Sequence, residues 1–473
     1  MKFILMTRKT ILLFILFIVY TVSFGQNVTI KGHTTGAKEK CVRVKAYSDF
    51  ISFKEELLAT SYTDTNGYFE TKLKINDNRY GKIYIDYYSS DIYLEPNKNY
   101  EIQTSKITIN ETTDKENHFL KPLTFDYVFL NSKPDDINIL IQKFNVLYNS
   151  FVIKNIRLCR SKIFKAKYDT LKQAVADTFK NINNEYLRNY IRFRYASLEF
   201  EINMGSDNYI FDKYLYKQPI LFENIEFMNF FNEFYESYFN QADKPVRLYD
   251  IVKAVNLQKS KEALLDTLGK DTIFINEYYR EVVALKLLNM AYGMPDFSPS
   301  NVIEVLKQFA DKSKFDKVKL ISKNIISVLT RLTPGTPAPD FKISNIDGDK
   351  VTLNDFKGSI LYLTFFQSRN IPCLEEFEMM RKLYDKYSDT IQFVALCCDR
   401  DSSTYSKFVK EKQYKWPVLY CGMNFKLLEN YNIKSFPAFV IIDRNLNIMI
   451  NPAVKPSSNI ESVFKEIGRF EKK

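Results

Sequence analysis

The chain has 473 residues, which is too long for one compact core, so roughly two to four domains are expected. Its hydrophobic content of 45% and charged content of 26% are typical of a globular protein, although 39 Phe and 32 Tyr accompany a single Trp. The net charge of +11 does not indicate nucleic-acid binding, because Lys and Arg are interspersed with Asp and Glu and form no basic arm or zinc pattern.

The first 25 residues have the layout of a signal peptide. A basic start, MKFILMTRKT, precedes an apolar run of twelve residues, ILLFILFIVYTV, and the small residues Ser23 and Gly25 follow before Gln26. About 20 apolar residues are needed to span a membrane, so cleavage is favoured over anchoring. We therefore predict a signal peptide over residues 1–25 and export to the periplasm or cell envelope. Membrane contact is expected only through this segment while it is uncleaved.

Residues 26–110 are predicted to form an antiparallel β-sandwich. The segments NVTIKGHT, CVRVKAYS, YFETKLKI and GKIYIDYY alternate apolar and polar residues with a period of two, as half-buried strands do. Asn66 and Gly67 stand between two strands and predict a hairpin turn. The segment contains no evident catalytic group, which indicates a structural or protein-binding role.

Residues 111–332 are predicted to be all-α. The segment DDINILIQKFNVLYNSF carries an apolar stripe at helical spacing, formed by Ile137, Leu140, Ile141, Phe144 and Leu147. The segment IEFMNFFNEFYESYF repeats this pattern with aromatic residues. Such stripes usually pack in a core, and a ligand groove lined with them is the alternative. We interpret this region as a helical spacer or docking module.

Residues 333–473 are predicted to form an α/β domain. The segment RLTPGTPAPDF is rich in Pro and Gly and marks a linker at its entry. After it, strands alternate with helices over about 140 residues, which indicates a central mixed sheet. The whole chain is therefore expected to be a multidomain α+β protein with a sandwich, a central helical region and this C-terminal domain.

The cysteines do not form a disulfide framework or a metal site. Six cysteines in a chain of this length are few, but four of them, Cys373, Cys397, Cys398 and Cys421, fall in the C-terminal domain. The only histidines, His33 and His118, are far from these cysteines in the sequence, and paired C-x-x-C spacing is absent. No metal and no cofactor are predicted.

The C-terminal domain resembles the thioredoxin-fold family in its exported TlpA/ResA-like branch. Three stretches carry the resemblance: PGTPAPDFKISNIDGDKVTLNDFKGSILYLTFF, SRNIPCLEEF and YNIKSFPAFVIID. The resemblance covers roughly residues 333–473 and implies thiol–disulfide oxidoreductase chemistry, with a cis peptide bond before Pro437. The arrangement upstream resembles Gram-negative envelope members of the family, in which a β domain and a helical region precede such a domain.

The active-site motif of the family, W-C-x-x-C, is altered in this chain. Arg369 replaces the Trp, Asn370 replaces the nucleophilic cysteine, and Cys373 takes the resolving position. An amide cannot attack a disulfide, but Asn is a favoured N-cap for the helix that starts here. Glu375 and Glu376 follow, and they are expected to complement the helix dipole as solvated residues. We therefore interpret the motif as a degenerate active site.

Three roles are open for Cys373. In the first, it is a buried remnant of the motif. In the second, it is redox-active and pairs with another cysteine near the same edge of the sheet, namely Cys397, Cys398 or Cys421. In the third, it is a peroxidatic cysteine, as in peroxiredoxins, although Phe366 and Asn370 stand where that pattern has Pro and Thr or Ser.

The sequence favours a binding module with impaired or lost dithiol–disulfide exchange. The loop containing Phe436 and Pro437 is expected to run beside Asn370 and Cys373 and to offer backbone groups to an extended peptide. The expected partner is an envelope protein or peptide. The alternative is an active thiol–disulfide oxidoreductase or antioxidant protein that uses Cys373 with Cys397, Cys398 or Cys421, so whether the protein is an enzyme stays open.

Overall fold

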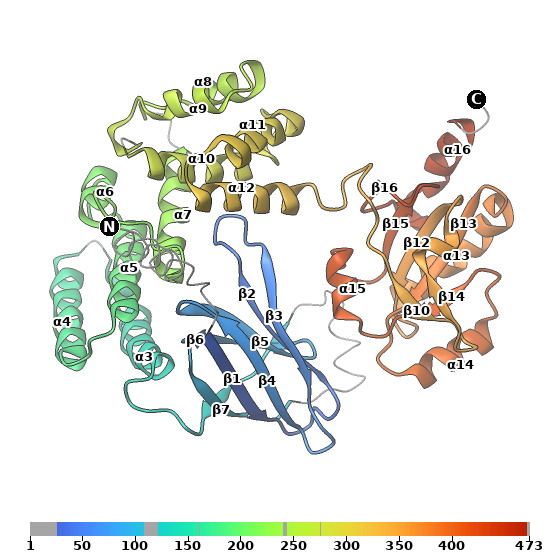
Figure 1. Cartoon of the computed structure of the whole chain (residues 1–473), viewed down its shortest axis with the longest axis horizontal. Helices are drawn as coiled ribbons and strands as arrows, with labels where there is room; N and C mark the ends of the chain where they lie inside the picture. The colour runs from blue at the N-terminus through green and yellow to red at the C-terminus, as the bar shows by residue number, and fades with distance from the viewer. Residues whose placement is uncertain (1–25, 108–121, 160, 240–243, 275, 471–473) are drawn as a thin grey trace, which may run out of the picture. The chain divides into compact units, whose positions relative to one another are not determined.

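The computed structural model describes residues 26–107, 122–159, 161–239, 244–274 and 276–470. The predicted signal peptide and His118 lie outside these ranges. The chain divides into two compact units (Figure 1). One contains Leu123–Leu329 together with the strands that precede it, and the other contains Thr330–Lys473.

The first unit begins with two β-sheets, as predicted, but neither is purely antiparallel, because β1 pairs with β7 and β6 pairs with β8 in parallel. One sheet has the strand order β4-β1-β7-β9 and the other the order β3-β2-β5-β6-β8. The alternating burial of β4 matches the period of two in its sequence. The strands are β1 (Gln26–His33), β2 (Cys41–Tyr47), β3 (Glu55–Tyr62), β4 (Tyr68–Ile75), β5 (Arg79–Ile85), β6 (Tyr88–Leu94), β7 (Asn99–Thr104), β8 (Leu123–Thr124) and β9 (Tyr127–Phe129). The last two strands lie within the range that was expected to be helical.

The turn at Asn66 and Gly67 does not close the hairpin that the sequence predicts. The turn itself is tight, since the Asp64 N–H donates to the Tyr68 carbonyl over 2.8 Å and Gly67 has a φ of +89°. However, β3 pairs with β2 in one sheet, whereas β4 pairs with β1 in the other. The turn therefore connects the two sheets, because β3 and β4 form their backbone hydrogen bonds with different strands.

A helical region follows and completes the first unit. Buried residues of the predicted stripe on α3 include Ile137, Leu140 and Phe144, whereas Leu147 is partly buried against the same core. The aromatic residues of α7 also pack in a core, where Phe227, Phe230, Phe231 and Phe234 are buried and Phe239 is partly buried. The helices are α3 (Ile137–Asn155), α4 (Lys162–Phe179), α5 (Glu185–Glu201), α6 (Asp207–Tyr214), α7 (Ile225–Phe239), α8 (Leu248–Val252), α9 (Lys261–Leu268), α10 (Glu277–Ala291), α11 (Pro299–Lys312) and α12 (Asp316–Leu329).

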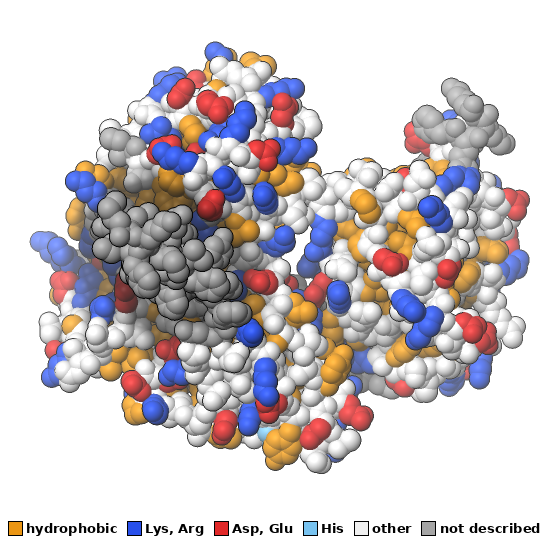
Figure 2. All heavy atoms as spheres, in the orientation of Figure 1, with side chains coloured by type: hydrophobic (Ala, Val, Ile, Leu, Met, Phe, Trp, Pro, Cys, Tyr) orange, Lys and Arg blue, Asp and Glu red, His pale blue; other side chains and the backbone are white. Residues whose placement is uncertain are grey.

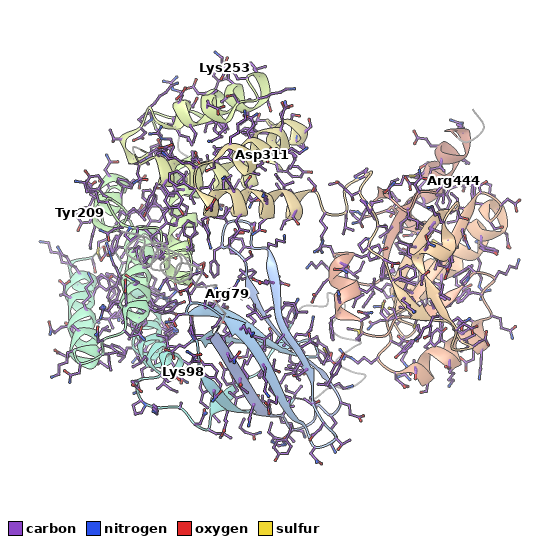
Figure 3. The ribbon with its side chains drawn as sticks, in the orientation of Figure 1. Arg79, Lys98, Tyr209, Lys253, Asp311 and Arg444 are labelled. Atoms are coloured by element: carbon purple, nitrogen blue, oxygen red, sulfur yellow. The ribbon has the colours of Figure 1, made fainter. Side chains whose placement is uncertain are left out.

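The loop between β2 and β3 joins the sheets to the helices. Phe50 and Ile51 at its tip are buried in the core of the helical region. The Asn232 side chain donates to the Phe50 carbonyl over 2.7 Å, and the Asn289 side chain donates to the Ile51 carbonyl over 3.0 Å. At the base of the loop, the side chain of Arg79, which is labelled in Figure 3, donates to the Tyr47 carbonyl over 2.8 Å. Strands and helices thus share one core in this unit.

The second unit has a mixed seven-stranded sheet flanked by helices, which confirms the predicted α/β domain. Its strand order is β11-β10-β14-β13-β12-β15-β16, and β12, β13 and β14 are parallel to one another. The elements are β10 (Lys342–Ser344), β11 (Lys350–Thr352), β12 (Ile360–Phe366), α13 (Ile371–Tyr387), β13 (Ile391–Cys397), α14 (Ser402–Lys412), β14 (Val418–Tyr420), α15 (Phe425–Asn430), β15 (Ala438–Ile442), β16 (Ile448–Ile450) and α16 (Ile460–Phe470).

The surface of the protein carries charges of both signs. On the face in Figure 2, Lys and Arg side chains are interspersed with Asp and Glu on both units. Among the helices that the structure describes, none has the length and apolar character needed to cross a membrane.

Candidate functional site

The strand register of the second unit collects the predicted site residues at one edge of the sheet. Phe366 at the end of β12 pairs with Cys397 of β13, which pairs with Tyr420 of β14. Because parallel strands bring their carboxyl ends to the same edge, the residues that follow them lie there too. Antiparallel β15 begins at this edge, where Ala438 pairs with Phe365. The edge therefore gathers Gln367–Asn370, Cys398, Asp399, Cys421 and Pro437.

Asn370 caps the helix that starts at this edge. Its backbone is extended, with φ −85° and ψ 113°, and its side-chain oxygen accepts the Cys373 N–H over 3.3 Å. The predicted N-cap is confirmed, and Pro372 in the first turn suits a helix start because its missing N–H has no helical partner there. The position that carries the nucleophile in the family motif thus supports the helix and supplies no thiol.

Cys373 is buried completely, with 0% of its surface exposed. Burial raises the pKa of the Cys373 thiol to about 12, and the charges of Asp399 and Glu376 act in the same direction. A hydrogen bond from the Gln367 backbone opposes this rise in the pKa but does not cancel it. At pH 7 only about one thiol in 10⁵ would be ionised, whereas an ordinary cysteine is ionised to about 3%. Cys373 is therefore a very weak nucleophile.

Asp399 fixes the turn that leads into α13, a role that the sequence interpretation missed. It follows Cys398 at the end of β13 and is buried. Its carboxylate accepts the Ser368 N–H over 2.9 Å and also the Ser368 hydroxyl. The signal was present in the sequence, because a polar residue directly after a buried parallel strand lies at the same edge as the residues after β12.

Glu376 is buried, which corrects the expectation that it is a solvated residue on the helix face. Its carboxylate accepts the Ser457 N–H over 2.8 Å and the Ser457 hydroxyl over 2.6 Å, and Lys455 Nζ lies 3.6 Å away. Glu375, one residue earlier, is exposed as expected. The difference follows from the helical turn, since Glu376 lies three residues after Cys373 on the buried side of α13.

The peptide bond between Phe436 and Pro437 is cis, as the family resemblance implied. Register places Pro437 beside the end of β12, because the next residue, Ala438, pairs with Phe365. The Phe436 side chain is buried, whereas Pro437 and Ala438 are partly exposed. The binding role of Phe436 and Pro437 stays a prediction.

The structure brings two of the four C-terminal cysteines into contact. The Sγ atoms of Cys398 and Cys421 lie 3.1 Å apart, and both residues are thiols. Cys397 is buried in β13, and burial raises the pKa of its thiol well above the ordinary value. Among the described residues, no group of three or more His, Cys, Asp or Glu side chains could hold a metal ion.

Comparison with known proteins shows which proteins this unit is similar to. The family model described as the AhpC/TSA family matches residues 334–450. The thiol–disulfide oxidoreductase ResA of Bacillus cereus (strain ATCC 10987 / NRS 248) is 30% identical over 112 residues, or 24% of this chain and 64% of that protein. The thioredoxin-like protein YneN of Bacillus subtilis is 30% identical over 114 residues, or 23% of this chain and 65% of that protein. The chain thus spans a little under two thirds of the length of these relatives.

Solved structures also match this unit. The thioredoxin domain of a thiol–disulfide oxidoreductase from Bacteroides vulgatus is 23% identical, with a TM-score of 0.27, and the match covers 28% of this chain and 98% of that one. A thiol:disulfide interchange protein from Bacteroides sp. is 22% identical, with a TM-score of 0.27, over 30% of this chain and 91% of that one. The C-terminal unit is a thioredoxin-like domain. It is related to thiol–disulfide oxidoreductases of the ResA and TlpA type.

Proposed function

We propose that the protein is an exported binding module of the cell envelope. In this proposal the thioredoxin-like domain holds an extended peptide segment of an envelope protein and does not exchange disulfides through the Asn370–Cys373 position. The observation that carries the proposal is the state of that position, where Asn370 caps the helix and Cys373 is fully buried. Export rests on the signal-peptide layout of residues 1–25.

The chemistry of exchange supports loss of the reaction. Disulfide exchange requires a thiolate that can reach the sulfur of the partner. Burial raises the pKa of the Cys373 thiol to about 12, and no surface of this residue is open to a partner. The sulfur contact found among the described cysteines joins Cys398 to Cys421 and does not involve Cys373. The alternative, dithiol chemistry that includes Cys373, therefore has less support.

The geometry around the position supports binding. A helix starts at this edge after Asn370, and β12 pairs with β13 and β15 beside it, so the edge is ordered although position 370 carries no thiol. Ile371, the first residue of α13, exposes 68% of its surface, and Pro372 beside it is also exposed. Two exposed apolar residues at the edge where Pro437 lies give an extended peptide an apolar contact as well as backbone partners.

The test separates binding from redox chemistry. Reduced and carboxymethylated α-lactalbumin is an unfolded polypeptide whose cysteines are blocked, so its binding requires no thiol. We expect the purified protein to bind it in fluorescence anisotropy, and Ile371→Asp to weaken binding about tenfold or more. Met379→Asp is the matched control, because Met379 is an exposed apolar residue two turns further along α13. Cys373→Ala should leave binding unchanged.

The same protein is then assayed for insulin reduction with dithiothreitol. We expect no turnover above the background of the reagent. Turnover that is lost in Cys373→Ala would show that the position is catalytic, and absence of any binding to the blocked polypeptide would contradict the binding role.

A further inference from the structure

Cys398 and Cys421 are placed for a covalent bond. Their sulfurs lie 3.1 Å apart, and a disulfide requires about 2.05 Å, so an approach of about 1 Å would suffice. The backbone holds the two residues side by side. The N–H groups of Cys421 and Gly422 both donate to the Cys397 carbonyl, over 3.0 and 3.1 Å.

We infer that Cys398 and Cys421 form a reversible disulfide that links the ends of β13 and β14. This modification is separate from the proposed binding role, because it does not use Asn370 or Cys373. The choice of Cys398 over Cys397 follows from the strand, where successive side chains point to opposite faces. Cys398 meets the Cys421 sulfur, whereas Cys397 continues the buried strand.

The two thiols differ in access, which assigns the order of the reaction. Cys421 exposes 8% of its surface and Cys398 exposes none. The Cys421 thiolate attacks a low-molecular-weight disulfide, forms a mixed disulfide and releases one thiolate of that reagent. The Cys398 thiolate then attacks the Cys421 sulfur, forms the intramolecular bond and releases the second thiolate. Two protein thiols are oxidised, one reagent disulfide is reduced to two thiols, and these take up the two protons.

The bond would affect the candidate site through Asp399. This residue follows Cys398 directly, and its carboxylate accepts the Ser368 N–H over 2.9 Å in the turn before α13. Oxidation therefore ties the end of β14 to Cys398, the residue directly before the one that holds that turn. The two cysteines are 23 positions apart, and closing a loop of this size is expected to raise the melting midpoint of the domain by roughly 10 °C.

The experiment uses the purified protein with oxidised glutathione as the probe. After free thiols are alkylated in denaturant, non-reducing digestion and mass spectrometry should find a peptide pair that joins Cys398 to Cys421, and dithiothreitol should remove it. Cys398→Ser and Cys421→Ser should each abolish the pair and the rise in melting midpoint. Cys397→Ser, a substitution of the adjacent buried cysteine, should keep both.

Some results would overturn the inference. If Cys398 and Cys421 are both fully alkylated after treatment with the oxidant, the pair does not form. A bond from Cys421 to Cys397 or Cys373 would assign the reaction to another sulfur. The map of the unaltered protein decides the matter even if a serine variant fails to fold.

Discussion

Replacing Asn370 with cysteine is expected to create a weak dithiol site. The change removes the side-chain oxygen that accepts the Cys373 N–H over 3.3 Å, and loss of such a cap costs about 1 kcal/mol. Domains have stabilities of about 5–15 kcal/mol, so the variant should fold. The helix dipole favours a thiolate at this position by about 0.3–1 kcal/mol, which lowers the pKa of the new thiol by less than about one unit.

The geometry limits the new bond. Asn370 is the N-cap and has an extended backbone, so the Cβ spacing of residues within a helix does not apply to this pair. A disulfide requires Cβ atoms about 3.5–4.5 Å apart, and the buried Cys373 has little freedom to reach this distance, so the bond should form slowly. In addition, Asn370 exposes only 6% of its surface, which restricts attack on a large partner. We therefore expect the cysteine variant to reduce insulin faster than the unaltered protein does, but still slowly.

Peptide mapping after treatment with oxidised glutathione checks the bond, and insulin turnover checks the activity. Asn370→Ser is the matched control, because serine can cap the helix but carries no thiol. If the cysteine variant folds, as judged by its melting curve, and forms no bond between positions 370 and 373, then the position has lost the geometry of the family motif as well as its nucleophile.

Four further outcomes are expected. Iodoacetamide should alkylate Cys373 at least about a thousandfold more slowly than it alkylates glutathione at pH 7, because the pKa of the Cys373 thiol is about 12. Mass spectrometry measures the rate of alkylation. Equal rates for the two thiols would contradict the burial of Cys373. Since this folded-state pKa lies above the unfolded value of about 8.5, the thiol contributes stability below that pH, and the melting midpoint of the domain should fall as the pH rises from about 9 towards 12. Phe50→Ala should lower the free energy of unfolding of the first unit by about 3–5 kcal/mol in urea titrations, whereas Phe53→Ala, in the same loop but 45% exposed, should have a much smaller effect. Asp399→Ala should cost about 1–3 kcal/mol, because it leaves the buried Ser368 N–H without its acceptor, and an unchanged urea midpoint would show that the turn is held in another way.

Features that depend on neighbouring residues could be predicted from the sequence. The alternation along β4 and the stripe on α3 determine which side chains are buried, because strand and helix periods place them on one face. The cap at Asn370 is equally local, since donor and acceptor are three residues apart.

Other features were decided only by tertiary structure, because a periodic pattern shows which face is buried but not what covers it. The turn at Asn66 and Gly67 has the residues of a hairpin turn. However, β3 pairs with β2 and β4 pairs with β1, so the two strands belong to different sheets. Glu376 is buried because Ser457, 81 positions later, reaches it. Likewise, the sequence left three partners open for Cys373. In the structure, the pairing of β13 with β14 instead brings the thiols of Cys398 and Cys421, which are 23 positions apart, into contact.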